Sequence, residues 1–240
     1  MVNPRILVGT PTHKSKFYCL IEWIENIKKL DYNNFDVLLV DNSGDDSYKE
    51  LIEKQGIKCI SGPLTDTAQK TLCDSRKIFF DYAIKNNYDY VLSVEQDIFP
   101  PPDTIKKLLS HKKKVVGGLY LLSSFCDEKK RRKKDWVASC ADLKKEIKLD
   151  KGHKAMFWLL LSEVQNKGLL RVRSCCYGCT LIRRDVLAKV GPRVIEGLNR
   201  YDDYYFFEDC LKQKIPVYCD TQRVIPHFPS LGGGSGWLNL

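Results

Sequence analysis

Residues 90–97 read YVLSVEQD, a short and largely apolar run followed at once by Glu95, Gln96 and Asp97. Tyr90–Val94 has the length and the Val and Leu content of a strand buried in a parallel sheet. Runs of the same kind come earlier in the chain, at Arg5–Gly9, Asp36–Val40 and Ile57–Ile60. Helical patterns alternate with these runs, which implies right-handed crossovers. We therefore expect an α/β fold with a mostly parallel central sheet flanked by helices.

Apolar residues recur at three- and four-residue steps over Phe17–Ile27 and again over Leu72–Ala83, which predicts two amphipathic helices. The second half of the chain is less regular, and we expect loops and helices over residues 125–166. Its clearer elements are a short helix after Asp103, strands at Lys114–Tyr120, Cys176–Ile182 and Val217–Cys219, and helices at Arg184–Val190 and Asp203–Lys214. We expect a single domain over 1–240, with a nucleotide-binding half (1–97), an acceptor and catalytic half (98–228) and a flexible, glycine-rich tail (229–240).

The composition is that of a globular protein, with 43% hydrophobic and 29% charged residues in a chain of 240. A net charge of +9 favours anionic partners without choosing among them. No apolar run approaches the roughly 20 residues that a membrane-spanning helix needs. The N-terminus lacks the pattern of a signal peptide, so we expect a soluble, cytoplasmic protein. The basic run Lys129–Lys134 is either a solvated loop or a peripheral contact with an anionic membrane.

The ten cysteines do not have the paired spacing of a zinc site, and buried thiols that pack as small apolar side chains are the better interpretation.

Polar side chains follow the predicted parallel strands at the points where they end. Ligands of open α/β sheets bind beyond the carboxyl ends of the strands, so these side chains should converge on one crevice. They fall into three groups, Thr10, Pro11 and Thr12, then Asp41, Asn42 and Ser43, then Glu95, Gln96 and Asp97.

The crevice lacks the glycine-rich loops that cradle phosphates in dinucleotide-binding and P-loop folds. A diphosphate would then need a divalent cation, held by Asp97 and helped by Arg76, and oxygen ligands favour Mg²⁺ or Mn²⁺. In an extended segment Glu95 and Asp97 would point to the same side. Structural alternatives stay open: Asp97 as a loop residue, Asp41 as a turn residue, and Arg76 as a surface partner of Asp74 or Asp81.

The order and spacing of several short motifs resemble the GT-A glycosyltransferases, particularly the family-two group of inverting enzymes. The likeness spans roughly residues 5–228. The motifs that carry it are Ile6–Pro11, Val40–Ser43, Ser93–Asp97, Gly117–Tyr120, Tyr177–Thr180, Asp203-x-x-Phe206, Val217–Asp220 and His227. Two departures stand out: Glu95 replaces the first Asp of the Asp-x-Asp metal motif, and Lys214 replaces a common glycine.

The resemblance implies a role for each motif. The nucleotide would contact Thr10, Pro11, Asp41, Arg76 and Gln96, with Asp41 recognising the base. The metal, Mn²⁺ or Mg²⁺, would be held by Asp97, His227 and Glu95. Asp203 would be the general base, in competition with Asp202, Glu208 and Asp209. Acceptor-side contacts would come from Gly118, Tyr120, Tyr177 and Gly178.

We therefore expect a metal-dependent, inverting glycosyltransferase that moves a sugar from a UDP- or GDP-sugar to a saccharide or lipid-linked acceptor. Two alternatives are a sugar-1-phosphate nucleotidyltransferase and a non-catalytic basic module that binds nucleic acid. The first needs a glycine-rich basic loop that Gly9–Lys14 matches poorly. The second leaves the acidic strand ends unexplained, so we do not expect a nucleic-acid partner.

Overall fold

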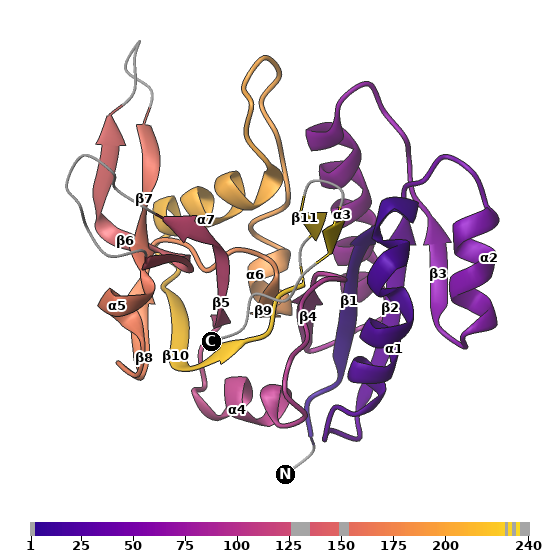
Figure 1. Ribbon diagram of the computed structural model, residues 1–240, viewed down its shortest axis with the longest axis horizontal. Coiled ribbons are helices and arrows are strands. Elements are labelled where there is room, and N and C mark those ends of the chain that lie inside the picture. Colours follow the sequence, from indigo (N-terminus) through magenta and orange to yellow (C-terminus); the bar gives the residue numbers. More distant parts are fainter. Residues whose placement is uncertain (1–2, 126–134, 149–153, 229, 232–233, 236–240) are drawn as a thin grey trace.

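The computed structural model describes residues 3–125, 135–148, 154–228, 230–231 and 234–235. Within those residues, ten strands form one central sheet, with helices packed against it (Figure 1). One half of the sheet is parallel, in the order β3, β2, β1, β4: β1 (Ile6–Thr12), β2 (Phe35–Asp41), β3 (Lys58–Ser61) and β4 (Tyr90–Val94). The carboxyl ends of these four strands therefore share one edge, as the sequence predicts.

The other half of the sheet is mixed, and the order continues β9, β5, β10, β8. Only β5 and β10 pair in parallel here; β9 runs antiparallel to β4 and β5, and β8 runs antiparallel to β10. The bounds are β5 (Val115–Phe125), β8 (Leu169–Val172), β9 (Cys179–Arg183) and β10 (Val217–Ile225).

Helices cover the two faces of the sheet, and the strands alternate between them. In β1, Ile6 and Val8 pack in one buried cluster, and Leu7 packs in the other. The first cluster contains α1 (Leu20–Lys28), α2 (Ser47–Lys54) and α4 (Thr104–Ser110). The second contains α3 (Ala68–Lys85), α5 (Leu161–Val164), α6 (Arg184–Leu187) and α7 (Asp202–Lys212). A 3₁₀ helix, η1 (Lys14–Cys19), links β1 to α1.

Of the loops and helices expected over residues 125–166, the described part contains the short helix α5, but most of it is strand. Two long antiparallel strands, β6 (Asp135–Lys148) and β7 (Lys154–Leu160), continue the sheet from β5 and lie at the opposite end of the molecule from β3 (Figure 1). The β6–β7 ladder contains two register shifts. Each shift breaks the two-residue alternation by which a strand is recognised in a sequence.

The α/β fold class is confirmed, although the sheet is more mixed than we expected. The basic run Lys129–Lys134 lies outside the described residues. In the tail, Ser230–Leu231 pairs with Gly234–Ser235 in a two-stranded ladder. All nine described cysteines are buried and free, as expected of apolar packing. None of the helices in the described part of the chain is long and apolar enough to cross a membrane.

Candidate active site

A cavity of about 440 Å³ lies at the shared carboxyl edge of β1 and β2. Pro11, Thr12 and Asn42 line it from the strand ends, as the position of these residues in the sequence predicts. The rest of the wall comes from η1 and the residue before it, from α3 and the loop that precedes it, and from the residue before α7. These residues are His13, Ser15, Lys16, Leu64, Thr65, Ala68, Thr71, Leu72 and Tyr201. The cavity is thus formed by elements that are far apart in the chain and meet at one edge of the sheet.

Gln96 does not line this cavity. Its side chain is 2% exposed, and it accepts a hydrogen bond from the Thr12 hydroxyl. Its amide nitrogen donates to the Lys16 carbonyl oxygen at 2.9 Å and to the Tyr48 hydroxyl at 2.8 Å. Every polar atom of the Gln96 side chain is therefore engaged by the protein. Gln96 thus connects the ends of β1 and β4. We had expected it to contact the nucleotide instead.

Asp41 is buried at the end of β2, directly before the cavity residue Asn42. Its Oδ1 accepts hydrogen bonds from the Ser43 backbone N–H at 3.0 Å and the Ser43 hydroxyl at 2.5 Å. Burial raises the pKa of Asp41, and the bonds from Ser43 act in the opposite direction. Asp41 therefore forms the turn that the sequence left open as an alternative. That turn also fixes the position of Asn42 at the cavity wall.

Asp97 and His227 come together where β4 and β10 end. The Phe228 N–H donates to the Asp97 carbonyl oxygen at 2.7 Å, which ties the two segments together. His227 Nδ1 lies 2.6 Å from the Leu121 carbonyl oxygen, so this nitrogen carries the proton and donates it. His227 Nε2 then faces Asp97 Oδ2, at 3.6 Å. Two expected metal ligands, 130 positions apart in the sequence, are therefore neighbours in the fold.

The Asp97 carboxylate is 6% exposed, and its two oxygens have different surroundings. Oδ2 contacts the Lys16 ammonium group, whereas Oδ1 is buried with no hydrogen-bond partner among the described residues. Burial acts to raise the pKa of Asp97, but the neighbouring His227 and Lys16 side chains outweigh it, and the pKa lies below its usual value. Buried charges in proteins are usually paired or coordinate metals, so this carboxylate is a candidate cation ligand.

Glu95 does not join this pair. The Ile98 N–H donates to the Glu95 carbonyl oxygen at 2.9 Å, so residues 95–98 form a turn. The extended segment that would align Glu95 with Asp97 is therefore absent there. Glu95 Oε1 instead lies 3.7 Å from the Arg76 guanidinium. Within the described residues, no group of three or more His, Cys, Asp or Glu side chains is arranged to hold a metal ion.

Arg76 is held in the core. Its side chain is 1% exposed, and Nε lies 2.8 Å from Asp202 Oδ2. A second guanidinium nitrogen is 3.3 Å from the Ser93 hydroxyl, and the Tyr177 ring lies 4.2 Å from the guanidinium carbon. Arg76 is therefore not free to contact a diphosphate as it stands, and it does not form a surface pair with Asp74 or Asp81. Arg76 instead ties α3 to the ends of β4 and α7.

Asp203 lies beside this pair, in the first turn of α7, and has no cationic partner among the described residues. Its Oδ1 accepts a hydrogen bond from the adjacent Tyr204 N–H at 2.7 Å. Desolvation, followed by the charges of Asp202 and Glu95, raises the pKa of Asp203 to about 7. A carboxyl group that titrates near neutral pH is suited to accept and release protons.

The competing carboxylates of α7 are already neutralised. Arg173 forms two hydrogen bonds with Glu208, at 2.5 and 2.8 Å, and Arg193 forms two with Asp209, at 2.5 and 2.9 Å. Asp202 forms an ion pair with Arg76. Among the acidic residues at 202–209, only Asp203 is left without an ion pair in the described structure.

The four expected acceptor-side residues are buried and do not line the 440 Å³ cavity. Tyr177 packs on Arg76, and the Gly178 N–H donates to the Tyr120 hydroxyl at 3.2 Å. A Cβ atom at Gly178 would lie 2.4 Å from the Tyr120 ring, so the close approach of the two segments requires glycine. Gly118 lines a different pocket, described next.

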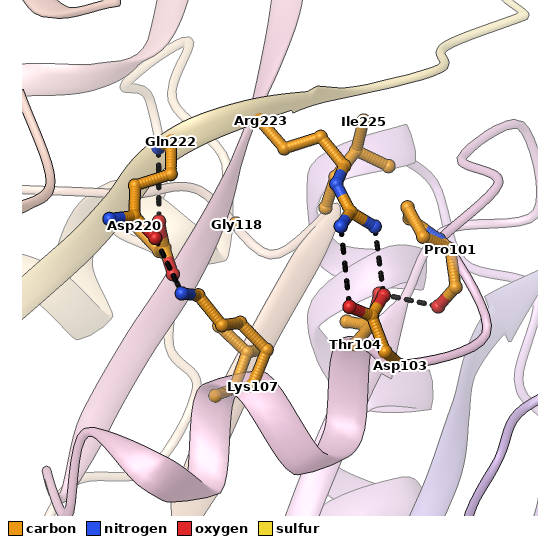
Figure 2. A pocket seen from close by; sticks show the side chains of 10 residues that line it. Pro101, Asp103, Thr104, Lys107, Gly118, Asp220, Gln222, Arg223 and Ile225 are labelled. Carbon is orange, nitrogen blue, oxygen red and sulfur yellow. Dashed lines mark hydrogen bonds and ion pairs between the residues drawn. The ribbon is translucent and has the colours of Figure 1, made fainter. Parts of the chain in front are cut away.

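That second pocket, of about 160 Å³, lies between α4 and β10 (Figure 2). Figure 2 shows Arg223 of β10 reaching Asp103 at the start of α4, with an N–O distance of 2.8 Å. Lys107 likewise lies 4.0 Å from Asp220. These charges pair across the pocket wall, so they connect α4 to β10 and leave no unpaired group that would attract a ligand.

Several cavity residues were not anticipated from the sequence. Lys16 and Thr71 lie one or two turns away from the strand ends, on η1 and α3. Leu64 and Tyr201, which are 63% and 46% exposed, come from loops. Proximity to a predicted strand end would have singled out Lys16. Nothing in the sequence pattern brings Leu64 or Tyr201 to the same wall.

An α/β domain with a cavity at the carboxyl edge of its parallel strands, and an Asp–His pair nearby, has the architecture of the GT-A nucleotide-sugar transferases. The sequence matches the model of glycosyl transferase family 2 over residues 8–191. The chain therefore belongs to this family.

Solved structures show the same fold at low sequence identity. TarS of S. aureus in complex with UDP-GlcNAc is 14% identical, with a TM-score of 0.55, and the match covers 92% of this chain and 57% of TarS 1-349. The mannosyltransferase PcManGT of Pyrobaculum calidifontis, in complex with GDP-Man and Mn²⁺, is 12% identical, with a TM-score of 0.57 and coverage of 97% and 59%. The present chain thus spans under two thirds of either protein. No curated protein sequence matches significantly.

Proposed function

We propose that this chain is a metal-dependent glycosyltransferase that uses a nucleoside-diphosphate sugar as donor and Asp203 as general base. The observation that carries the proposal is the arrangement of Asp97 and His227 beside the cavity, in a member of glycosyl transferase family 2. Family membership favours glycosyl transfer over a nucleotidyltransferase or a nucleic-acid-binding module.

The cavity suits the nucleoside part of the donor. Its walls are apolar at Leu64, Leu72 and Tyr201 and polar at Thr12 and Asn42. The two solved neighbours carry UDP-GlcNAc and GDP-Man, so UDP and GDP are the nucleotides that we propose for this chain. Pro11 would contact the base, and the buried Thr10 would support the strand end beneath it.

The residues present fit a divalent cation. Asp97 would provide its carboxylate, whose Oδ2 faces His227 and whose Oδ1 has no partner among the described residues, and His227 would provide Nε2, its ring fixed by the bond from Nδ1 to Leu121. A ligand histidine is commonly oriented by such a second hydrogen bond. Oxygen and imidazole ligands suit Mn²⁺, with the donor phosphates completing the shell. A bound cation would stabilise the departing nucleoside diphosphate as a Lewis acid.

Asp203 would take the proton from the acceptor hydroxyl as that oxygen attacks the anomeric carbon of the donor. Attack from the face opposite the leaving diphosphate gives inversion. Asp202, paired with Arg76, would position the start of α7, and the charge of its carboxylate would favour proton uptake by the adjacent Asp203. The acceptor would be a saccharide or a lipid-linked sugar, and the basic run Lys129–Lys134 would serve a lipid-linked acceptor by contacting anionic membrane.

Activity should fall in acid. We expect kcat/KM to drop about tenfold per pH unit below a pKa near 7, because the protonated Asp203 cannot accept a proton. Above that pKa, the protonation of Asp203 should no longer change kcat/KM. A pH–rate profile at saturating Mn²⁺ measures the effect. A fall in kcat/KM centred near pH 4 would instead indicate a carboxylate with an ordinary pKa, and would contradict Asp203 as a general base with a raised pKa.

Replacing Asp41 should weaken nucleotide binding. We expect Asp41→Ala to lose about tenfold or more in affinity, the scale of one hydrogen bond to a charged group, because Asp41 recognises the base or fixes Asn42 at the cavity. Isothermal titration calorimetry with UDP and GDP gives the affinity, and circular dichroism checks the fold. Unchanged affinity with lower stability would reduce Asp41 to a turn residue.

The activity itself is tested by following nucleoside diphosphate release from UDP- and GDP-sugars, with and without EDTA, over a panel of saccharide and lipid-linked acceptors. NMR of the product's anomeric proton then reads inversion or retention. Release that needs both an acceptor and Mn²⁺ supports the proposal. Release from no donor under any of these conditions counts against it.

A further inference from the structure

Lys16 pairs with the oxygen of Asp97 that faces His227, which is where a metal ion bridging the two side chains would bind. Its ammonium group contacts Asp97 Oδ2, the same oxygen that faces His227 Nε2. A cation bound between Asp97 and His227 would lie within a few ångströms of the Lys16 charge. Like charges at that separation repel strongly in a site with little water. The ammonium group and a divalent cation that bridges Asp97 and His227 therefore compete for Oδ2 of this carboxylate.

The Lys16 side chain has room to move away from Asp97. Its side chain is 36% exposed, whereas that of Asp97 is 6% exposed, so the lysine can move while the carboxylate stays. Lys16 also lines the 440 Å³ cavity, so its flexible stem already lies along the wall where a nucleotide would bind. A lysine ammonium group is a mobile point charge that binds phosphate well. The donor diphosphate would thus give it a second anionic partner.

We propose that Lys16 is an exchangeable counter-cation, which neutralises Asp97 in the metal-free protein and moves to the donor diphosphate when a divalent cation takes its place. This inference rests on the proposed function, because it assumes that Asp97 binds metal. Its consequence is that metal and nucleotide bind cooperatively. Metal alone must displace Lys16 without compensation, whereas metal arriving with a diphosphate leaves Lys16 paired. By linkage, each ligand raises the affinity of the other.

The test is the dissociation constant of Mn²⁺, read from the electron paramagnetic resonance signal of free Mn²⁺, for the full chain alone and with UDP or GDP. We expect Lys16→Met to bind Mn²⁺ alone at least tenfold more tightly than the wild type, because nothing then competes for Asp97. The gain in Mn²⁺ affinity on adding nucleotide should be smaller in the variant.

The chain contains a matched control. Lys14, two residues away, pairs with Asp45 at 2.7 Å, is 53% exposed and does not line the cavity. Lys14→Met removes the same charge and should leave Mn²⁺ affinity unchanged. Lys16→Gln, which keeps a neutral hydrogen-bond donor, guards against misfolding, with circular dichroism as the check, and should also bind Mn²⁺ more tightly.

The outcomes separate the two proposals. Equal Mn²⁺ affinities of wild type, Lys16→Met and Lys16→Gln, with Asp97→Asn binding none, would overturn the exchange and leave the metal site standing. Tighter binding in Lys14→Met as well would also overturn it, since the effect would then be one of net charge. Absence of Mn²⁺ binding in every protein, with or without nucleotide, would overturn both proposals.

Discussion

Asp203→Asn is expected to lower kcat by about 10²–10⁴-fold while donor and metal affinities stay within a factor of a few, because general-base catalysis supplies a rate gain of that size. The amide keeps the size of the side chain but cannot accept the acceptor's proton. A loss in kcat rather than in donor affinity indicates an interaction made mainly in the transition state. Steady-state kinetics with the donor varied, together with calorimetry of nucleotide binding, measure both quantities.

Asp209→Asn is the matched control on the same helix. Asp209 is paired with Arg193, whose side chain is 39% exposed, so its loss should change turnover little. If Asp209→Asn or Glu208→Gln abolishes turnover while Asp203→Asn retains it, the base lies further along α7. If none of these changes affects turnover, Asp203, Glu208 and Asp209 are all excluded as the general base.

Stability gives an independent check that Asp203→Asn is folded. The pKa of Asp203 is raised in the folded state to about 7, so the folded protein holds this proton more tightly than the unfolded chain. The stability that this proton contributes is complete below the unfolded pKa, near 4, and is lost as the pH rises to 7. Asp203→Asn should therefore unfold at a higher temperature than the wild type at pH 8, and the difference should shrink toward pH 4.

Asp97→Asn is expected to abolish the stabilisation that Mn²⁺ and a nucleoside diphosphate together give the protein. At about 100 times the dissociation constant, ligand binding stabilises the wild type by roughly 2.7 kcal/mol, which is about 5–10 °C for a domain of this size. An amide is a neutral, weaker metal ligand, so the variant should show only the small shift that nucleotide gives in EDTA. Differential scanning fluorimetry measures both.

Asp45→Asn is the corresponding control, since Asp45 is the partner of Lys14 in an exposed ion pair. Its shift with Mn²⁺ and nucleotide should match that of the wild type. An Asp97→Asn protein that retains the full metal-dependent shift would show that the cation binds elsewhere.

The parallel half of the fold could be predicted because its strands are short, buried on both faces and separated by clear helical patterns. The end of each strand then located Thr12, Asn42 and Asp97 at one edge by geometry alone. The β6 and β7 strands could not be recognised, since their register shifts break the alternation that identifies a strand.

The details of the site depend on contacts that a sequence does not encode locally. Arg76 pairs with Asp202, which is 126 residues away in the sequence. This pairing depends on the packing of α3 against α7, so it could not be predicted from the sequence. The turn at Glu95 separates its side chain from that of Asp97, although only Gln96 stands between the two residues in the sequence. Asp203 acquires its raised pKa from burial and from two carboxylates on different elements, Asp202 and Glu95, so its position in the motif does not reveal it.

The most direct test of metal-dependent donor binding is a thermal-shift titration of the wild-type chain with UDP and with GDP, each in Mn²⁺ and in EDTA. We expect one of the two nucleotides to raise the unfolding temperature by roughly 5–10 °C in Mn²⁺ at saturation, and by little in EDTA. An equal rise in EDTA would contradict a metal-bridged diphosphate at Asp97 and His227. No rise with either nucleotide would contradict the donor site itself.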